Sequence, residues 1–382
     1  MTEVGQQQAG GVRFRPASAG DIEAIRAGFR ARLAEQGYDR HVSESVADGA
    51  VTFHLRDDVR REWLPEWDTL GIAARLNLDV AGNPADQERE IVLALLGGPV
   101  PFEYPSLAGF ESVLRVRCNI ATAAAKTALS FDTSKAERPL DYWAYVENCG
   151  FTLLPGKSLV DALRLTTQPE ASGTLYSFSC YRATEYVILL GLAMELATCN
   201  PPLLQALEDQ WRQCAIMSAR FHDVFLHEYG SMETPLPPRY YVPGDRLWFR
   251  NPDERSADVT GFEGSWVFYH GGGLFTNFWK RDLPYTLESK CLEIFHWRDG
   301  YCCEPGERPW MDEDIVAEHV QATLADPERK RDIMARMLRY RDPRGVYQEG
   351  GCIDTTREYP RRVCPGSPEL VLPELDRIAV AR

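Results

Sequence analysis

The residue best suited to nucleophilic chemistry is Cys180, which stands where a polar, glycine-containing segment becomes an apolar helix expected over residues 181–198. Unpaired backbone N–H groups and the positive end of the helix dipole gather at such a helix start. Both favour the thiolate over the thiol, which is what a nucleophilic cysteine needs. The same N–H groups could bind the oxyanion of a tetrahedral intermediate. A free cysteine can also be a small buried hydrophobe, and that alternative stays open at this point.

A thiol nucleophile needs a base and a group that orients the base, and three later residues are candidates for these roles. His270 ends an aromatic segment beside three glycines, Glu263 begins that segment, and Asn277 lies on the next predicted strand. We expect them to complete a catalytic group with Cys180, with Asn277 as an orienting amide. The alternatives are a turn histidine, a surface glutamate and a strand-end amide.

The elements that must position these residues follow from periodicity and from helix-start and turn signals. Helices are expected over 21–36, 85–96, 107–129, 157–165, 181–198, 202–225, 313–325 and 327–340, the third capped by Ser106. Short aromatic and β-branched strands are expected over 239–242, 244–250, 264–270 and 273–279. The order of helices, then antiparallel strands, then helices predicts an α+β fold.

Composition excludes several classes of protein. The 382 residues carry 42 Lys and Arg against 56 Asp and Glu, a net charge of −14. Nucleic-acid binding without sequence preference needs a basic footprint, so we expect no nucleic-acid partner. No apolar run approaches the roughly 18 residues that span a bilayer, and the N-terminus lacks the apolar stretch of a secretory signal. We therefore expect no membrane association and a cytoplasmic protein, whose ten cysteines are reduced thiols.

No motif in the chain indicates a cofactor or a metal. The glycines at 271–273 are not followed by a helix or by Lys and Ser/Thr, so they are not a phosphate loop. A dinucleotide fingerprint, H-E-x-x-H and G-x-S-x-G are all absent. We expect neither a cofactor nor a metal ion.

Five short segments together resemble the bacterial spore-coat type of transglutaminase, a papain-like protein-glutamine gamma-glutamyltransferase. They are PVPFEYPS at 99–106, RCNIA at 117–121, YW at 142–143, YSFSC at 176–180 and GDRLWFRNP at 244–252. Each segment is weakly specific for the family, but the order and spacing of the five segments are much more specific. The resemblance covers roughly residues 95–285 and leaves both flanks outside.

The resemblance implies that Cys180 is the acyl-accepting nucleophile and that the family's glutamate falls at Glu263 or one position beside it. It also shows a departure, because the family's histidine position is Asn277 here and the acidic residue before the cysteine is Ser179. Three possibilities stay open. His270 has taken over as base, Glu263 acts alone with Asn277 orienting, or the activity is altered.

The implied reaction is attack of the thiolate on a glutamine carboxamide, loss of ammonia, and resolution of the thioester by an amine to an amide or isopeptide bond. A hydrophobic wall would favour the amine over water, and we expect it from Trp248, Trp266, Phe275 and Trp279. The partners would be a protein or small-molecule acyl donor and an amine acceptor. One alternative is an amide synthase that takes its acyl group from a carrier-protein thioester. Another is a catalytically inactive binding or assembly protein of the same fold.

Composition, periodicity and the resemblance together predict a domain organisation, in which the papain-like core is what the resemblance implies. We expect a mobile tail over residues 1–15 and a largely helical extension over 16–94. A papain-like core, with a central buried helix packed on an antiparallel sheet, is expected over 95–298. A helical extension and tail would occupy 299–382.

Overall fold

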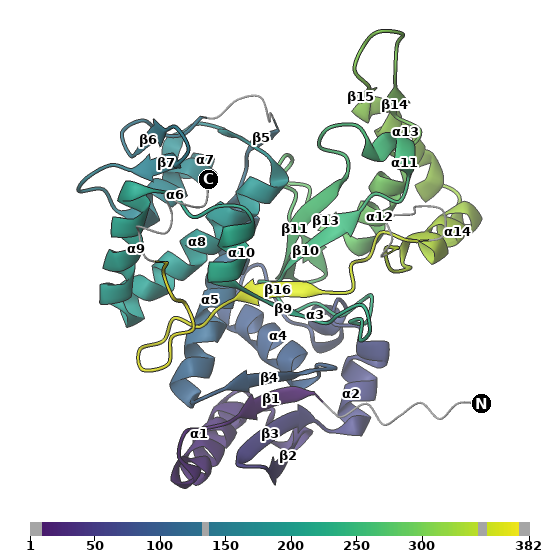
Figure 1. The fold of residues 1–382 in the computed structure, drawn as a ribbon. Helices are drawn as coiled ribbons and strands as arrows, with labels where there is room; N and C mark the ends of the chain where they lie inside the picture. The colour runs from purple at the N-terminus through teal and green to yellow at the C-terminus, as the bar shows by residue number, and fades with distance from the viewer. Residues whose placement is uncertain (1–9, 132–136, 343–349, 374–382) are drawn as a thin grey trace.

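The computed structural model describes residues 10–131, 137–342 and 350–373, and it has an α+β architecture (Figure 1). Most of the expected N-terminal tail, residues 1–9, lies outside the described residues. Residues 11–14, expected to belong to that tail, instead form a buried strand. No helix in the described ranges has the length and apolar character needed to cross a membrane.

The N-terminal region is built on a four-stranded sheet as well as on helices. The strand order is β2 (Val42–Ala47), β3 (Ala50–Leu55), β1 (Gly11–Phe14) and β4 (Pro101–Tyr104). Helix α1 (Ile22–Glu35) and helix α4 (Pro84–Leu96) share a hydrophobic core with this sheet, and both were predicted within one residue. The strands were not predicted, so the region 16–94 is less helical than expected.

Two long helices form the centre of the molecule. Helix α5 (Leu107–Lys126) begins at Ser106, whose hydroxyl accepts a hydrogen bond from the Gly109 amide, as predicted. Helix α8 (Cys180–Cys199) packs against it so closely that a Cβ on Gly191 would lie 2.4 Å from the Ile120 side chain. Helix α8 is therefore the buried central helix that its apolar sequence predicted.

The predicted helix over 202–225 is wrong as a single element. The structure has α9 (Pro201–Gln213) and α10 (Ala219–Phe225) instead. Cys214, which follows α9, is extended (φ −159°, ψ 132°), and Ser218, just before α10, has a φ of 61°, so neither residue continues a helix. With α6 (Leu159–Thr167), these helices surround α8 in one hydrophobic core.

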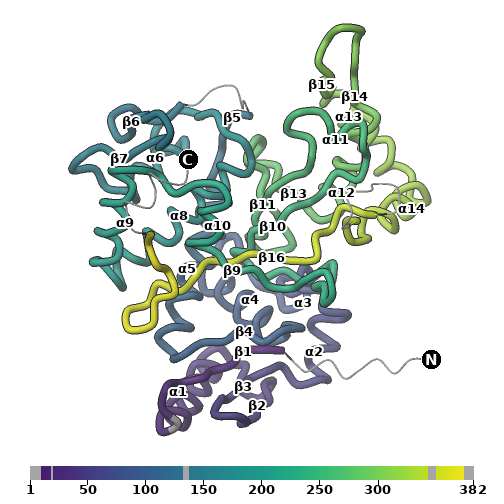
Figure 2. Tube along the Cα trace, in the orientation of Figure 1, coloured from purple at the N-terminus to yellow at the C-terminus, as the bar shows by residue number. Residues whose placement is uncertain are grey.

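A six-stranded antiparallel sheet packs beside α8, and its inner strands include the predicted ones. Its order is β13 (Tyr285–Thr286), β12 (Leu274–Phe275), β11 (Gly264–Gly271), β10 (Arg246–Arg250), β16 (Arg357–Pro360) and β9 (Leu226–Tyr229). The expected strand at 239–242 is absent, because residues 240–242, although buried, lie irregularly between turns at 238–239 and 243–244 that lead into β10. Strand β16 comes from the predicted C-terminal tail and lies between β10 and β9, as the yellow trace in Figure 2 shows.

Beyond the sheet, a third core is formed by α12 (Leu287–His296), α13 (Glu313–Leu324) and α14 (Pro327–Met337), the last two as predicted. Shorter helices are α2 (Asp57–Trp63), α3 (Ile72–Leu76), α7 (Pro169–Ser172) and α11 (Glu254–Ala257). Three strand pairs complete the fold: β5 (Ser130–Phe131) with β8 (Ser177–Phe178), β6 (Trp143–Val146) with β7 (Gly150–Leu153), and β14 (Tyr301–Cys302) with β15 (Trp310–Met311).

A buried ion pair joins α5 to the start of β10. Arg117 Nη1 donates to Asp245 Oδ1 at 2.8 Å, and both side chains are fully buried. Asp245 also accepts hydrogen bonds from the Val242 amide and the Tyr229 hydroxyl. Since breaking such a pair leaves an uncompensated buried charge, it fixes the sheet against the central helices.

Candidate active site

Cys180 is the first residue of α8, as its sequence position predicted. Ser179 caps the helix, and its hydroxyl accepts a hydrogen bond from the Arg182 amide at 3.3 Å. The rest of α8 is buried over nearly its whole length, so the helix cannot shift without disturbing the main core. The thiol is partly buried and stands at the start of this buried helix.

The expectation that this thiol has a depressed pKa is wrong. Burial raises the pKa of Cys180, and this outweighs the opposing contributions. The backbone N–H groups of Trp266 and Tyr181 and the charge of Lys290 lower its pKa, while the Glu263 carboxylate raises it further. Desolvation therefore favours the neutral thiol despite the helix start, and the thiol must give up its proton to a base in order to react.

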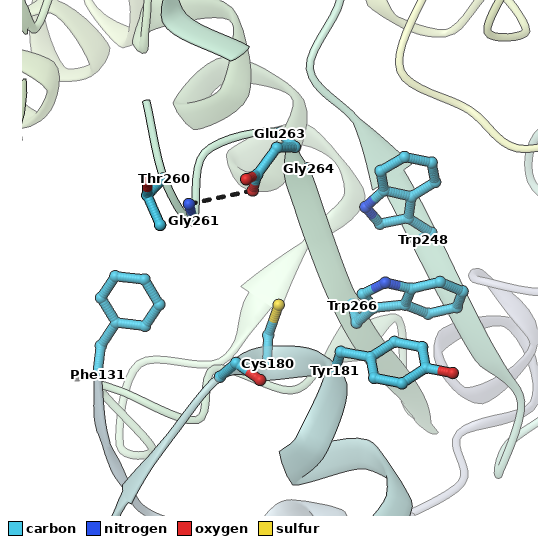
Figure 3. Close-up of a pocket in the computed structure, with 10 residues that line it drawn as sticks. Phe131, Cys180, Tyr181, Trp248, Thr260, Gly261, Glu263, Gly264 and Trp266 are labelled. Atoms are coloured by element: carbon cyan, nitrogen blue, oxygen red, sulfur yellow. Dashed lines mark hydrogen bonds between the residues drawn. The ribbon is translucent and has the colours of Figure 1, made fainter. Parts of the chain in front are cut away.

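The sulfur faces a pocket with a cavity volume of about 290 Å³. Its lining comes from the segment before α8, from β5, from β10, and from the loop that leads into β11. Figure 3 shows the Cys180 side chain pointing into this space, with Glu263 across from it. The lining residues are Phe131, Ser179, Cys180, Tyr181, Trp248, Thr260, Gly261, Glu263, Gly264 and Trp266.

Aromatic rings form one side of the pocket. Trp248 and Trp266 are directly opposite on β10 and β11 and stack at 5.8 Å with only 11° between their planes. Tyr181 meets the edge of Trp266 at 5.5 Å, which extends the row toward the cysteine (Figure 3). Phe131, 38% exposed, faces the pocket from the other side. Such a lining holds apolar chains and displaces water from the sulfur.

The loop that carries Glu263 is fixed on both sides by close contacts. A Glu263 carboxylate oxygen accepts a hydrogen bond from the Gly261 amide at 3.1 Å (Figure 3). A Cβ on Gly264 would lie 2.2 Å from Trp248 Nε1, and one on Gly261 would lie 2.4 Å from the Phe131 ring. Only glycine lets the loop approach these rings so closely.

Asn251 holds the same loop from behind. Its buried side-chain amide donates to the Phe262 carbonyl at 2.9 Å, and its backbone N–H donates to the Glu263 carbonyl at 3.1 Å. Asn251 also donates to Ser256 Oγ at 2.9 Å. It is therefore a positioning residue for the carboxylate that faces the cysteine.

Arg246 supports the aromatic row. Its guanidinium lies over Trp266 at 4.7 Å and over Tyr181 at 5.3 Å. It pairs with Glu358 of β16 and donates to Thr184 Oγ1 of α8 at 3.3 Å. Strand β16 thus supplies the Glu358 carboxylate, which balances the charge of Arg246 and holds its guanidinium against Trp266 in the wall of the pocket.

The structure brings only part of the predicted group together: Cys180, Glu263, Trp248 and Trp266. His270 is not in the lining, because it lies four residues beyond Trp266 along β11, roughly 13 Å at the usual strand rise. Burial lowers the pKa of His270 to about 4, and its ring is hydrogen-bonded to the Phe275 backbone.

The other predicted residues have structural contacts. Asn277 donates to the Leu283 carbonyl at 2.9 Å and accepts from the Lys280 amide at 3.1 Å, so it closes a turn. Phe275 is fully buried in the third core. Trp279 reaches the pocket only through its edge contact with Phe131 at 5.1 Å.

Sequence reasoning missed Phe131, Tyr181, Gly264, Arg246 and Asn251. Two of these stand in the segment GDRLWFRNP, which had been singled out, so that segment held the signal for positioning residues. Phe131 follows a helix from a different part of the chain, and nothing in its local pattern indicates a pocket. Cys180 and Glu263 are the only lining residues with side chains typical of metal ligands, which is too few for a metal site.

The comparison with protein-family models agrees with the chemistry that this pocket allows. The family model described as protein-glutamine gamma-glutamyltransferase matches residues 73–349, a range that contains both Cys180 and Glu263. The chain therefore belongs to the protein-glutamine gamma-glutamyltransferase family and is an acyl transferase. The family's substrates are a protein glutamine as acyl donor and an amine as acceptor.

Two further comparisons complete these findings. Among solved structures, the chain is similar to the transglutaminase from Geobacillus stearothermophilus without its C-terminal extension, at 19% identity and a TM-score of 0.39. That match covers 57% of this chain and 98% of the other. The search of curated proteins found no significant match.

Proposed function

We propose that Cys180 and Glu263 form the catalytic pair of a protein-glutamine gamma-glutamyltransferase, and that the core around α8 and the six-stranded sheet is papain-like. The observation that carries the proposal is that one pocket holds a partly buried thiol at a helix start and an exposed carboxylate opposite it. Because burial raises the pKa of Cys180, the carboxylate is needed as the proton acceptor.

In the acylation step, Glu263 takes the thiol proton and the sulfur attacks the glutamine carboxamide carbon. The backbone N–H groups of Tyr181 and Trp266 hydrogen-bond to the Cys180 sulfur, and in this scheme they donate to the oxyanion that forms beside it. When the C–N bond breaks, Glu263 returns the proton to the leaving nitrogen, so that ammonia departs and a thioester remains.

In the second step, the acceptor amine attacks the thioester and loses a proton to Glu263. The C–S bond breaks, the sulfur recovers that proton, and the isopeptide is released. The aromatic row of Trp248, Trp266 and Tyr181 provides an apolar path for the aliphatic part of a lysine side chain and reduces the access of water. His270 and Asn277 have no role in this scheme.

The proposal is tested by incorporation of a fluorescent primary amine into casein. We expect the wild-type chain to label casein and Cys180→Ala to abolish the labelling. Cys303→Ala, which removes an exposed thiol outside the pocket, should leave it unchanged. Labelling that survives Cys180→Ala would refute the assignment. If casein is never labelled but an acyl thioester acylates the fluorescent amine, with Cys180 still required, the result would instead favour carrier-dependent amide synthesis.

A further inference from the structure

A second group of chemically active side chains lies in the C-terminal helical unit. His296 is the last residue of α12, Asp299 follows in the next turn, and His319 lies on α13. His296 Nδ1 is 2.6 Å from Asp299 Oδ2, and His319 Nδ1 is 3.8 Å from the same oxygen. The three potential ligand atoms all lie within 4.8 Å of one another, and none of the three residues lines the cysteine pocket.

The buried imidazole is held in place from its far side. The His296 side chain is fully buried, and its Nε2 lies 2.8 Å from Thr323 Oγ1 of α13. A threonine hydroxyl can donate or accept, so it serves either tautomer of the ring. This leaves Nδ1 free to carry a proton toward Asp299 or to present its lone pair to a cation. Metal-bound histidines are oriented in this way by a partner on the second nitrogen.

We propose that His296, Asp299 and His319 bind a divalent transition-metal ion of the Zn²⁺ kind. Two imidazoles and one carboxylate are a ligand set that Zn²⁺ accepts in proteins, and they carry the negative charge that a dication needs. Bonds of 2.0–2.1 Å to a tetrahedral ion place the ligand atoms about 3.3 Å apart. The distances of 2.6 and 3.8 Å from Asp299 Oδ2 to the two imidazole nitrogens lie on either side of that value, so small side-chain rotations are sufficient.

Binding involves no redox step and takes no net proton from the neutral imidazole. The His296 proton moves from Nδ1 to Nε2, so that Nε2–H donates to Thr323 Oγ1 and Nδ1 presents its lone pair to the metal. Asp299 and His319 side chains are 30% and 41% exposed, so water can reach the fourth position. Arg329 of α14 is a positively charged neighbour of His296, and its charge would repel the bound ion.

A metal here would reinforce a weakly packed helix. Among the residues of α13, only Val316 and Thr323 are buried. An ion pair between His296 and Asp299 alone does not explain why His319 also lies beside the Asp299 carboxylate. Nor does it explain why the His319 ring contacts the His296 ring at 5.6 Å. A shared ion would join the end of α12 to α13 and fix the C-terminal unit.

The test is a Co²⁺ titration of the full, untagged chain after removal of metals, followed by visible spectroscopy. We expect a single equivalent of Co²⁺ to give the absorption of a tetrahedral nitrogen–oxygen site, and Zn²⁺ to abolish it. Asp299→Asn and His319→Gln should each weaken binding by more than the roughly 10–100-fold that loss of an outer-shell partner costs. His319 is partly exposed, so its variant keeps the test valid even if Asp299→Asn fails to fold.

Two control variants make the test specific. His41→Gln removes a histidine of the N-terminal region and should leave the titration unchanged. Cys303→Ser removes the exposed thiol and should also leave it unchanged. The proposal is overturned if no tetrahedral absorption develops, or if Asp299→Asn and His319→Gln both titrate like the wild type. A cobalt–thiolate spectrum that disappears in Cys303→Ser would overturn it as well.

Discussion

Replacing Glu263 by Gln should separate proton transfer from the positioning of the loop. The glutamine keeps an oxygen that can accept the Gly261 N–H bond of 3.1 Å, so the loop loses no hydrogen bond. Because the side chain is exposed, the free energy of unfolding should change by no more than about 0.5 kcal/mol. The substitution therefore removes a proton acceptor and a charge, and little else.

The expected loss of turnover is large. A general acid–base group contributes roughly 10²–10⁴-fold to a rate. At 1.36 kcal/mol for each factor of ten, this is about 2.7–5.4 kcal/mol of activation free energy. The assay is the initial rate of fluorescent-amine incorporation into a glutamine-containing protein.

Alkylation of Cys180 should respond in the opposite direction. The Glu263 carboxylate raises the pKa of Cys180, so its removal increases the thiolate fraction near neutral pH. Iodoacetamide should therefore label Cys180 at least as fast in Glu263→Gln as in the wild type, while turnover falls.

Glu233→Gln is the matched control. Glu233 is an exposed carboxylate that does not line the pocket, and it accepts a hydrogen bond from Ser231. It should change neither rate. If turnover in Glu263→Gln stays within a factor of ten of the wild type, Glu263 is not the base. If alkylation and turnover fall together, the substitution has disturbed the pocket rather than proton transfer, and the reasoning fails.

Three further predictions concern two residues that support the pocket, Gly264 and Glu358, and His270 outside it. Gly264→Ala places a methyl group 2.2 Å from Trp248 Nε1 and should cost about 1–3 kcal/mol of stability, measured by urea unfolding, with a loss of turnover. Burial lowers the pKa of His270 to about 4 in the folded chain, so below pH 6.5 the unfolded chain takes up a proton that the folded chain does not. The free energy of unfolding should therefore be highest above pH 6.5 and should fall by about 3 kcal/mol as the pH falls toward 4. His270→Ala should flatten that part of the stability–pH curve and leave the rate of Cys180 alkylation unchanged. Glu358→Gln leaves Arg246 buried without its counter-charge and should cost about 3–5 kcal/mol in thermal unfolding.

Each of these predictions has its own control. Gly20→Ala meets only a serine hydroxyl at 3.6 Å and should be neutral. For His270, the decisive comparison is the difference in slope between variant and wild type, and an unchanged slope would contradict the burial argument. Glu288→Gln removes a carboxylate from a much more exposed ion pair, 43% exposed, and should cost no more than about 1 kcal/mol. If it destabilises the chain as much as Glu358→Gln does, the argument from the buried pair is wrong.

Local sequence signals predicted much of the fold and, in the candidate site, the position of Cys180 at the start of α8. The apolar run after Cys180 predicted α8, periodicity and turn signals predicted α1 and α4, and the Ser106 cap with a periodic face predicted α5. Choosing Cys180 as the proposed nucleophile needed only the junction between a polar segment and an apolar helix. The resemblance then indicated Glu263, which the structure places in the same pocket.

The rest depends on contacts between distant segments, which local patterns do not encode. Strand β16 looks like part of an Arg- and Pro-rich tail, yet it pairs within the main sheet and brings Glu358 to Arg246. The pKa of Cys180 could not be predicted from the helix start, because the rings that desolvate the thiol come from β10 and β11. His270 seemed well placed by its glycines, but the length of β11 carries it away from the sulfur.

The most direct test of the catalytic pair is to locate the acyl group on the chain. The protein is incubated with a glutamine-containing peptide in the absence of an amine acceptor, quenched in acid, digested, and mapped by mass spectrometry. We expect a thioester adduct, with loss of ammonia from the donor, on the peptide that contains Cys180, and none in Cys180→Ala. An adduct on another cysteine, or one that persists in Cys180→Ala, would contradict the assignment of the nucleophile.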